Sequence, residues 1–557
     1  MAAFLYGLPT TGVLQKPFTT NFADNSNMIA FFFQDNWKVT RKLTLNLGVR
    51  YEREGAMWER YNRSVAGFDP NAPQVFAAQV RANYAANPLP QLPASQFNVN
   101  GGLVFSGVSG NSKYLYNPFN LGIMPRLGFA YSWDAKTVIR GGWGTYFGSM
   151  GTRLQDALQY GFFQNTNVVP TLDGGQTFVA TMSNPFPNGF IEPPGATAGP
   201  AAAIGNPIQF FNQNPKPNRM RKWTVDIQRQ FGKNWVIDIG TAAENGGNLE
   251  VGNGPASVPT SLDALPNQYL STLPTRDQNN INNLTKAVPN PFNIPAFAGT
   301  QLAGSVIPAL NLLLPYPQFS SIGYYTYNGR SWYNSVQGSI AKRFSDNFSM
   351  NAGYTFSKFL EQTTLLNPGD PTPSKVISDV DAPHHVTIGA IYELPFGRGQ
   401  RLGSGLPRVL DYLVSGWQFS PIYRFQSGFP ITVPNLLLTG GDESIVPLPP
   451  GKRNIYQWFN TSAFNNVPSQ QLQYNLRTLS LRFGNLRADA YNYWDASLLK
   501  ETHIHENYLL QFRFEAINAL NQVTFSAPST TVGTTFGRIT AQNNVPRHMQ
   551  FTLRFAF

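Results

Sequence analysis

The segment from Met549 to Phe557, MQFTLRFAF, alternates strictly between large apolar side chains and polar or small ones. Successive side chains of a β-strand project to opposite faces, so this segment predicts a strand with one apolar and one polar face. The apolar face comprises Met549, Phe551, Leu553, Phe555 and Phe557. Such a strand fits either a membrane, with one face toward lipid and the other toward water, or the end of a soluble β-sandwich.

The composition favours a membrane β-protein over a helical one. The 557 residues include 49 Gly and 43 Pro, with 14% aromatic and only 13% charged residues, which indicates many strands and turns. No run of about 18 apolar residues occurs, which excludes a transmembrane helix. The mean hydropathy of −0.24 suits a barrel, because only every second residue of its strands faces lipid. The absence of Cys is consistent with an envelope protein, although many cytosolic proteins also lack Cys.

The net charge of +11 does not predict binding to nucleic acid. Lys and Arg are dispersed singly along the chain, without the basic cluster of a nucleic-acid-binding surface. A positive surface would suit contact with anionic lipopolysaccharide. The simpler interpretation is that these charges belong to turns and to a water-facing interior.

Further strands repeat the alternation and place their charges on one face. The clearest is 43–54, where Leu, Val and Tyr alternate with Thr, Asn, Arg and Glu, and 126–133, 223–231 and 508–516 follow the same pattern. A polar, charged interior is expected of a channel, so we predict that these charged side chains line a pore. The candidates are Arg50, Glu52, Arg126, Arg140, Asp226, Arg513, Glu515 and Arg554. Each can instead solvate the interior or pair with a neighbour.

Connections between the predicted strands are of two kinds. Tight turns are predicted at 40–42, 134–136, 232–233, 345–347 and 502–506. Long stretches rich in Pro, Gly and Asn separate the strand pairs at 55–119, 149–219, 244–330 and 430–489. Loops this long are uncommon in compact soluble domains, whereas outer-membrane barrels join short periplasmic turns to long outer loops. The asymmetry favours a barrel over a sandwich.

The pattern predicts thirteen strands. They are 28–39, 43–54, 122–133, 136–147, 221–231, 233–243, 332–344, 348–358, 385–394, 416–426, 490–501, 507–518 and 548–557. Residues 536–540 are a candidate for additional short β-structure in the last loop. Single-chain bacterial barrels have an even strand number, so an odd series whose first strand runs toward the periplasm implies further strands before residue 28.

Several strand motifs resemble those of a known family. FFFQDNWKVT at 31–40 and LTLNLGVRYE at 43–52 resemble a mid-barrel hairpin of TonB-dependent outer-membrane receptors. YELPFGRG at 392–399, SGWQ at 415–418 and QSGFP at 426–430 resemble the Oar-like subgroup, whose members carry a carboxypeptidase-regulatory-like N-terminal domain. The closing motifs are FRFEAINALN at 512–521 and PRHMQF at 546–551. The resemblance covers nearly the whole chain except the long loops.

This resemblance implies an all-β, transmembrane antiparallel barrel, present here as about 13 of about 22 strands with long extracellular loops. Residues 28–557 are expected to be the C-terminal portion of the barrel, and residues 1–27 a loop or N-terminal remnant. No signal peptide or plug is recognisable, which would suit a truncated gene model or a split receptor. Unpaired edges of such a partial barrel would be costly in lipid.

The resemblance also implies a location and partners. The location is the bacterial outer membrane, where the chain would contact lipid and lipopolysaccharide. The barrel assembly machinery would act on the terminal strand, and the TonB complex would act only through a plug that this chain lacks. The implied function is to bind an unknown substrate and pass it across the membrane. Alternatives are a passive porin, an adhesin-like barrel, or a soluble secreted β-protein with binding loops.

The sequence offers little for catalysis or for metal binding. We find no nucleophile elbow and no recognisable triad, so no enzymatic activity and no cofactor is expected. The pair His384-His385 follows Asp379 and Asp381, but no further ligand stands at a recognisable spacing. Asp442 and Glu443 alone fall short of the oxygen ligands that calcium takes. No metal site is therefore predicted.

Aromatic residues of the long loops are candidates to contact a carbohydrate, a peptide or a siderophore. They are Phe162, Phe163, Tyr324, Tyr325, Tyr327 and Trp332. The sequence does not choose among these ligands.

Overall fold

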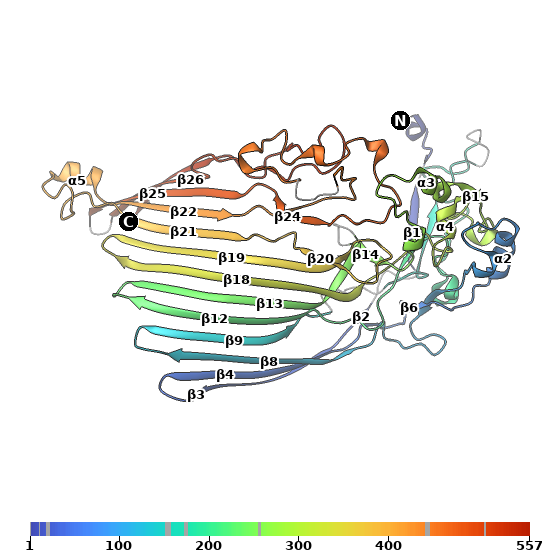
Figure 1. Cartoon of the computed structure of the whole chain (residues 1–557), viewed down its shortest axis with the longest axis horizontal. Coiled ribbons are helices and arrows are strands. Elements are labelled where there is room, and N and C mark those ends of the chain that lie inside the picture. The colour runs from blue at the N-terminus through green and yellow to red at the C-terminus, as the bar shows by residue number, and fades with distance from the viewer. Residues whose placement is uncertain are drawn as a thin grey trace.

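A computed structural model of the chain describes residues 2–10, 12–17, 23–150, 158–171, 177–253, 258–440, 446–505 and 508–557. Its main feature is a seventeen-stranded sheet, which Figure 1 shows as one wall of long strands lying side by side. Thirteen strands are long: β3 (Met28–Lys38), β4 (Leu43–Glu54), β8 (Phe119–Ser132), β9 (Thr137–Phe147), β12 (Arg219–Phe231), β13 (Trp235–Asn253), β18 (Thr326–Ser345), β19 (Phe348–Leu365), β21 (His384–Glu393), β22 (Trp417–Gln426), β25 (Tyr491–His505), β26 (Tyr508–Ile517) and β27 (His548–Ala556). Each of the thirteen predicted strands is present. The four short ones are β11 (Pro207–Gln209), β14 (Val258–Ser261), β17 (Ser321–Tyr324) and β20 (Ser374–Ile377).

The long strands form an antiparallel meander. Each pairs with the next long strand along the chain, from β3 through to β27. Within the described residues, no residue register joins β27 to β3. Every side chain of β3 is exposed, and so is every side chain of β27 except that of Ala556. Phe32 and Phe33, which point to opposite faces, are 75% and 70% exposed. β3 and β27 are therefore the two edges of an open sheet.

The register divides the sheet into two faces of different chemistry. Gly48 on β4 pairs with Arg126 on β8, and Arg140 on β9 pairs with Asp226 on β12, so these residues share one face. Continuing the register strand by strand places all eight predicted pore-lining residues on this face, which we call the polar face. The opposite, apolar face carries large side chains such as Trp143, Trp223, Ile239, Trp494 and Phe551.

Short turns join the strands at one end of the sheet, which we call the turn end. Gly232 in the β12–β13 turn and Asp346 and Asn347 in the β18–β19 turn have positive φ angles, as tight hairpins require. The predicted turn at 502–506 was wrong in its bounds, because β25 continues to His505 and residues 506 and 507 lie outside the described part. The connection between β21 and β22 is longer and contains α5 (Arg408–Val414).

The long connections at the other end, the loop end, are more ordered than the sequence predicted. Strands β13, β18 and β19 extend well into stretches expected to be loop. The loop end also contains α1 (Ala2–Leu5), α2 (Ala77–Ala86), α3 (Gln278–Thr285) and α4 (Ala309–Leu312). Five small sheets add β1 (Val13–Pro17) with β10 (Phe163–Asn167), β2 (Asp24–Asn25) with β5 (Trp58–Glu59), β6 (Val65–Asp69) with β7 (Gly102–Phe105), β15 (Ala287–Pro289) with β16 (Val306–Pro308), and β23 (Pro430–Thr432) with β24 (Arg482–Arg487). Residues 536–540 form no strand, contrary to expectation.

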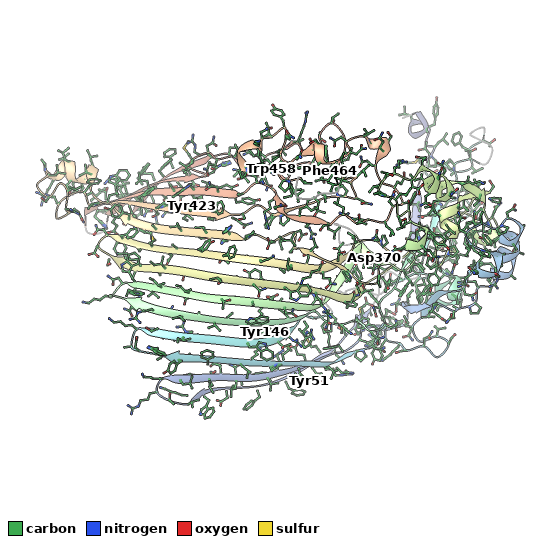
Figure 2. All side chains as sticks on the ribbon, in the orientation of Figure 1. Tyr51, Tyr146, Asp370, Tyr423, Trp458 and Phe464 are labelled. Carbon is green, nitrogen blue, oxygen red and sulfur yellow. The ribbon has the colours of Figure 1, made fainter. Side chains whose placement is uncertain are left out.

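The hydrophobic core of the protein lies at the loop end, not inside the sheet. One cluster joins Tyr84 and Phe97, whose rings stack 3.9 Å apart, to Phe292 and Phe297. A second contains Trp458, Phe459, Phe464 and Phe536. Figure 2 shows side chains crowded at the loop end and labels Trp458 and Phe464, which belong to the connection between β22 and β25. Within residues 1–27, expected to be a loop or remnant, the described strands β1 and β2 join this assembly, because β1 pairs with β10 and β2 with β5.

Candidate functional site

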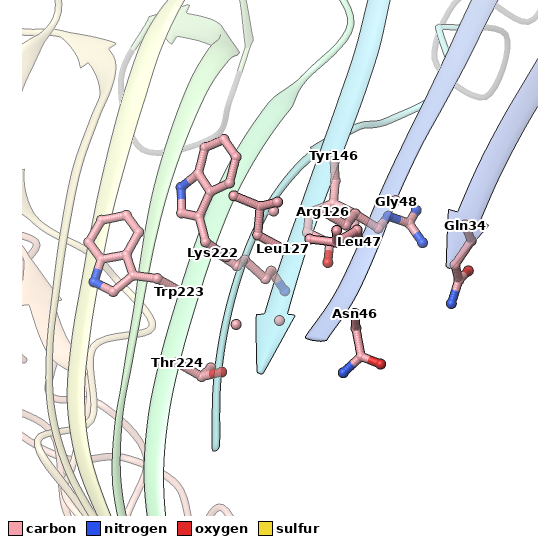
Figure 3. Close-up of a pocket in the computed structure, with 14 residues that line it drawn as sticks. Gln34, Asn46, Leu47, Gly48, Arg126, Leu127, Tyr146, Lys222, Trp223 and Thr224 are labelled. Atoms are coloured by element: carbon pink, nitrogen blue, oxygen red, sulfur yellow. The ribbon is translucent and has the colours of Figure 1, made fainter. Parts of the chain in front are cut away.

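A hollow of about 350 Å³ lies on the polar face, across five neighbouring strands (Figure 3). The polar-face residues that line it are Gln34 of β3, Asn46 and Gly48 of β4, Arg126 and Gly128 of β8, Gly142, Gly144 and Tyr146 of β9, and Lys222 and Thr224 of β12. The remainder of its lining comes from their chain neighbours Leu47, Leu127, Trp143 and Trp223.

Glycines form the floor of the hollow. Gly128 pairs with Asn46 on one side and with Gly142 on the other, and Gly142 pairs in turn with Thr224. A Cβ atom added to Gly142 would meet the Oγ1 atom of Thr224 at 3.7 Å, an ordinary contact, so a side chain would fit there. Glycine within a strand weakens the sheet and often marks a place where a ligand or another backbone approaches closely. At Gly142 the hollow therefore exists because a side chain is absent where there is room for one.

Two cations and a tyrosine border the glycine floor. The guanidinium carbon of Arg126 lies 4.9 Å from the ring centroid of Tyr146, which is within cation–π range. A Cβ atom on Gly144 would lie 2.9 Å from the hydroxyl of Tyr146, so this glycine makes room for the ring. The Nζ atom of Lys222 lies 3.2 Å from Glu244 Oε2 on the next strand. No lining residue is acidic, so the hollow favours an anionic or hydrogen-bond-accepting group.

The structure places most of the other predicted pore-lining residues in ion pairs on the polar face. Arg50 Nε and Glu52 Oε1 lie 2.5 Å apart along β4, and Arg140 Nη1 and Asp226 Oδ2 lie 3.7 Å apart between β9 and β12. On β26, Arg513 Nη1 lies 3.8 Å from Glu515 Oε1. Arg554 stands on the edge strand β27, opposite Gln511. These pairs are partly exposed, so each contributes less than about 1 kcal/mol.

Only Arg126 among the predicted residues lies in the hollow. Sequence reasoning missed Gln34, Asn46, Tyr146, Lys222 and the glycines. Their signal was present, because they stand at polar positions of the alternation and Gly142 and Gly144 are two residues apart on one face. The sequence alone did not reveal the strand register, which brings residues of five strands to one hollow.

Buried ion pairs hold the loop end to the sheet. Arg487 Nη2 lies 2.6 Å from Asp381 Oδ2, and Asp381 is 1% exposed. Arg482 Nη1 lies 2.7 Å from Glu361 Oε1, and Arg482 Nη2 lies 3.7 Å from Asp379 Oδ2. The two aspartates that raised the question of a metal site are therefore engaged by arginines.

In the described ranges, no group of three or more His, Cys, Asp or Glu is arranged to hold a metal ion. The Nδ1 atom of His384 lies 2.8 Å from the hydroxyl of Tyr354. Asp442 and Glu443 lie outside the described residues.

Several loop aromatics are structural. Phe162 is 4% exposed and packs edge-on against Phe105. Tyr324 stacks on Phe210 with a ring separation of 5.7 Å. Trp332, expected in a long loop, stands in β18, and the Nζ atom of Lys375 lies 4.4 Å from its ring centroid. Of the predicted ligand contacts, Phe162 and Tyr324 thus serve the loop packing.

The pKa values of two buried carboxyl groups at the loop end are shifted in opposite directions. Asp263 is 5% exposed and its Oδ1 atom accepts a hydrogen bond from the Tyr316 backbone N–H at 2.7 Å, while burial raises its pKa to about 7. Glu59 is fully buried. Burial by itself raises the pKa of Glu59, but hydrogen bonds from Arg63, Ala23 and Tyr61 outweigh it and lower the pKa to about 2.

Comparison with known proteins identifies the class. Among the described residues, no helix has the length and apolar character needed to cross a bilayer. Residues 1–550 match the family model described as an outer membrane beta barrel domain, and the chain belongs to this family. The protein is thus an all-β protein of the bacterial outer membrane. A search of curated protein sequences found no match.

Several solved structures are similar over nearly the whole chain. The outer membrane transporter YddB from Escherichia coli is 11% identical with a TM-score of 0.42, over 95% of this chain and 44% of that one. The siderophore receptor PiuA from Acinetobacter baumannii is 9% identical with a TM-score of 0.39, over 96% and 43%. The pyoverdine receptor FpvA from Pseudomonas aeruginosa is 11% identical with a TM-score of 0.39, over 96% and 45%. The chain spans less than half the length of each of these proteins.

Proposed function

We propose that the chain forms part of the barrel wall of a TonB-dependent transporter of the Oar-like type, which binds a substrate and passes it across the outer membrane. The observation that carries this proposal is the continuous single-layer antiparallel sheet, polar on one face and apolar on the other. The strand motifs at 31–52, 392–430 and 512–551, which resemble this group of receptors, support it independently.

The open edges of the sheet bear on how the barrel is completed. In lipid, the unpaired backbone groups of β3 and β27 would each cost several kcal/mol. Residues 28–557 therefore act as the C-terminal portion of a larger barrel, closed by further strands to an even number near 22. Under this proposal, the TonB complex acts on the barrel only through a plug, which another segment supplies.

The two faces suggest where partners act. Lipid covers the apolar face, and lipopolysaccharide surrounds the loop end. The barrel assembly machinery acts on β27, whose apolar residues are Met549, Phe551, Leu553 and Phe555, followed by Phe557. The substrate contacts the polar face, where the hollow with Arg126 and Lys222 suits an anionic or hydrogen-bonding group.

Transport can be tested without knowing the substrate. Bacteria that carry the intact gene are compared with a strain lacking it and with a strain lacking the TonB complex, and compounds left in the medium are measured by mass spectrometry. We expect the same compounds to remain in both deletion strains. Uptake that needs the gene but not the TonB complex would identify a passive porin, and uptake independent of the gene would overturn the proposal.

A further inference from the structure

The connection between β21 and β22, residues 394–416, differs from every other described connection at the turn end. The others are tight turns, whereas this one contains α5 and extends beyond the ends of the strands (Figure 1, at the left). We call it the α5 segment. Barrels keep their turns in the periplasm, so this segment lies at the phospholipid leaflet of the outer membrane.

The α5 segment exposes large apolar side chains. The helix has no buried residue. Val409 is 75% exposed, Leu413 63%, Leu402 50%, and Leu410 and Tyr412 47% each. Contiguous exposed apolar surface of this kind marks a site of interaction with a membrane or a partner.

An apolar hollow of about 450 Å³ lies between the segment and the sheet. The segment contributes Leu394, Phe396, Leu402, Gly403, Leu406, Leu413 and Val414, and the strands contribute Trp417 and Leu498. Trp417 pairs with Lys500 and Leu498 pairs with Phe419, so both belong to the apolar face of the sheet. The hollow is therefore continuous with the surface that faces lipid, and its lining suits a hydrocarbon chain.

Several basic residues belong to or contact the segment that carries this apolar surface. The segment carries Arg398, Arg401 and Arg408, and its one acidic residue is Asp411, whose Oδ1 atom accepts a hydrogen bond from the Arg398 backbone N–H at 2.6 Å. Lys500 reaches the segment from β25, where its Nζ atom donates to the Ser415 carbonyl at 2.6 Å. Apolar side chains combined with clustered arginines are typical of segments that lie in the interface of an anionic membrane.

We propose that the α5 segment binds an anionic phospholipid of the periplasmic leaflet. An acyl chain occupies the apolar hollow, and the arginines contact the headgroup phosphate. The exposed residues of α5 enter the surrounding interface and fix the depth of the turn end in the membrane. This inference uses the membrane location of the sheet and does not depend on transport or on its substrate.

Lipid binding can be tested by native mass spectrometry of the full-length protein in detergent, with phosphatidylglycerol as the probe. The test variant replaces Arg398, Arg401 and Arg408 together by Gln. The control variant replaces Arg41, Lys136 and Lys233 by Gln, which removes the same charge from the other turns. We expect a roughly hundredfold loss of bound lipid in the test variant, which corresponds to about 3 kcal/mol for three basic residues, and little change in the control. Equal losses in both would overturn the proposal.

A second measurement does not rely on a destabilising substitution. A photoreactive amino acid is placed at Leu406 in the hollow, or at Phe231, which lies on the apolar face at the turn end near Arg229 but outside the hollow. We expect crosslinks at 406 to be enriched in phosphatidylglycerol relative to the membrane, and those at 231 to follow its bulk composition. Bulk composition at both sites, or a protein crosslinked at 406, would contradict the assignment.

Discussion

Arg140 on β9 and Asp226 on β12 stand opposite each other in the strand register, with Nη1 and Oδ2 3.7 Å apart on the polar face. Arg140 also donates through Nη2 to Gln228 Oε1 at 3.0 Å. The pair is too exposed to contribute more than about 1 kcal/mol to stability. The pair matters because it reports the strand register. That register assigns every residue of β12 to either the polar face or the apolar face.

The two faces of β12 should respond differently to a charge. Val225 lies at the middle of the strand on the apolar face, and its neighbour Thr224 lies on the polar face. In the full-length protein in lipid vesicles, we expect Val225→Arg to lower the free energy of unfolding by about 2–4 kcal/mol and Thr224→Arg by less than about 1 kcal/mol. Denaturant unfolding followed by tryptophan fluorescence measures both. Equal effects would mean that the face assignment is wrong.

Filling the glycine-floored hollow should affect the substrate more than the fold. Gly142→Leu places a side chain into the hollow, where a Cβ atom meets only ordinary contacts. If the hollow takes part of the substrate, we expect uptake of the TonB-dependent compounds to fall about tenfold, which corresponds to about 1.4 kcal/mol. The amount of protein in the outer membrane, measured by immunoblotting, should not change.

Gly353→Leu is the matched control for that substitution. Gly353 lies on the polar face of β19, opposite Ser339, and a Cβ atom added there would meet nothing within 4 Å. It does not line the hollow. Uptake in this variant should remain at the wild-type level, and an equal loss in the two variants would assign the effect to the polar face in general instead of to the hollow.

Breaking the Asp381–Arg487 pair should loosen the loop end. Asp381 also accepts a hydrogen bond from the Phe359 N–H at 2.6 Å, so its carboxylate joins β19 to β24. Removing one member of a buried pair leaves an uncompensated charge, and we expect Asp381→Asn to cost about 3 kcal/mol. The double variant Asp381→Asn with Arg487→Met should recover part of this loss. Amide hydrogen exchange at the loop end provides the measurement, and wild-type protection in the single variant would contradict the prediction.

The sequence predicted the wall of the molecule well because period-2 alternation is a local signal. Strands such as 43–54 and 548–556 are recognisable from their own residues. The loop end is different, because Val80 of α2 and Val288 of β15 share one cluster although they are about 200 residues apart. On composition alone, these stretches were predicted to be irregular loops. The hollow was missed for the same reason, since Gln34 and Lys222 come to line one hollow only through a register spanning five strands.

The buried carboxyl of Asp263 should make the loop end sensitive to pH. In the folded loops its pKa is about 7, whereas an unfolded chain has the ordinary value near 3.8. The folded state therefore retains a proton that the unfolded state releases between these two values. Stabilisation by the protonated carboxyl is complete below about pH 4, is lost progressively as the pH rises toward 7, and changes no further above 7.

Asp263→Asn should remove this dependence, because the amide is neutral at every pH and its oxygen can still accept from the Tyr316 N–H. We expect hydrogen-exchange protection around Tyr316, after correction for intrinsic rates, to be greater at pH 5 than at pH 8 in the wild type and equal at both in Asp263→Asn. Asp69→Asn, at an exposed loop-end carboxylate, is the control and should retain the wild-type difference. A wild type with equal protection at pH 5 and pH 8 would show that Asp263 is ionised in the folded loops at both values. Burial would then have been offset by a contact other than the Tyr316 hydrogen bond.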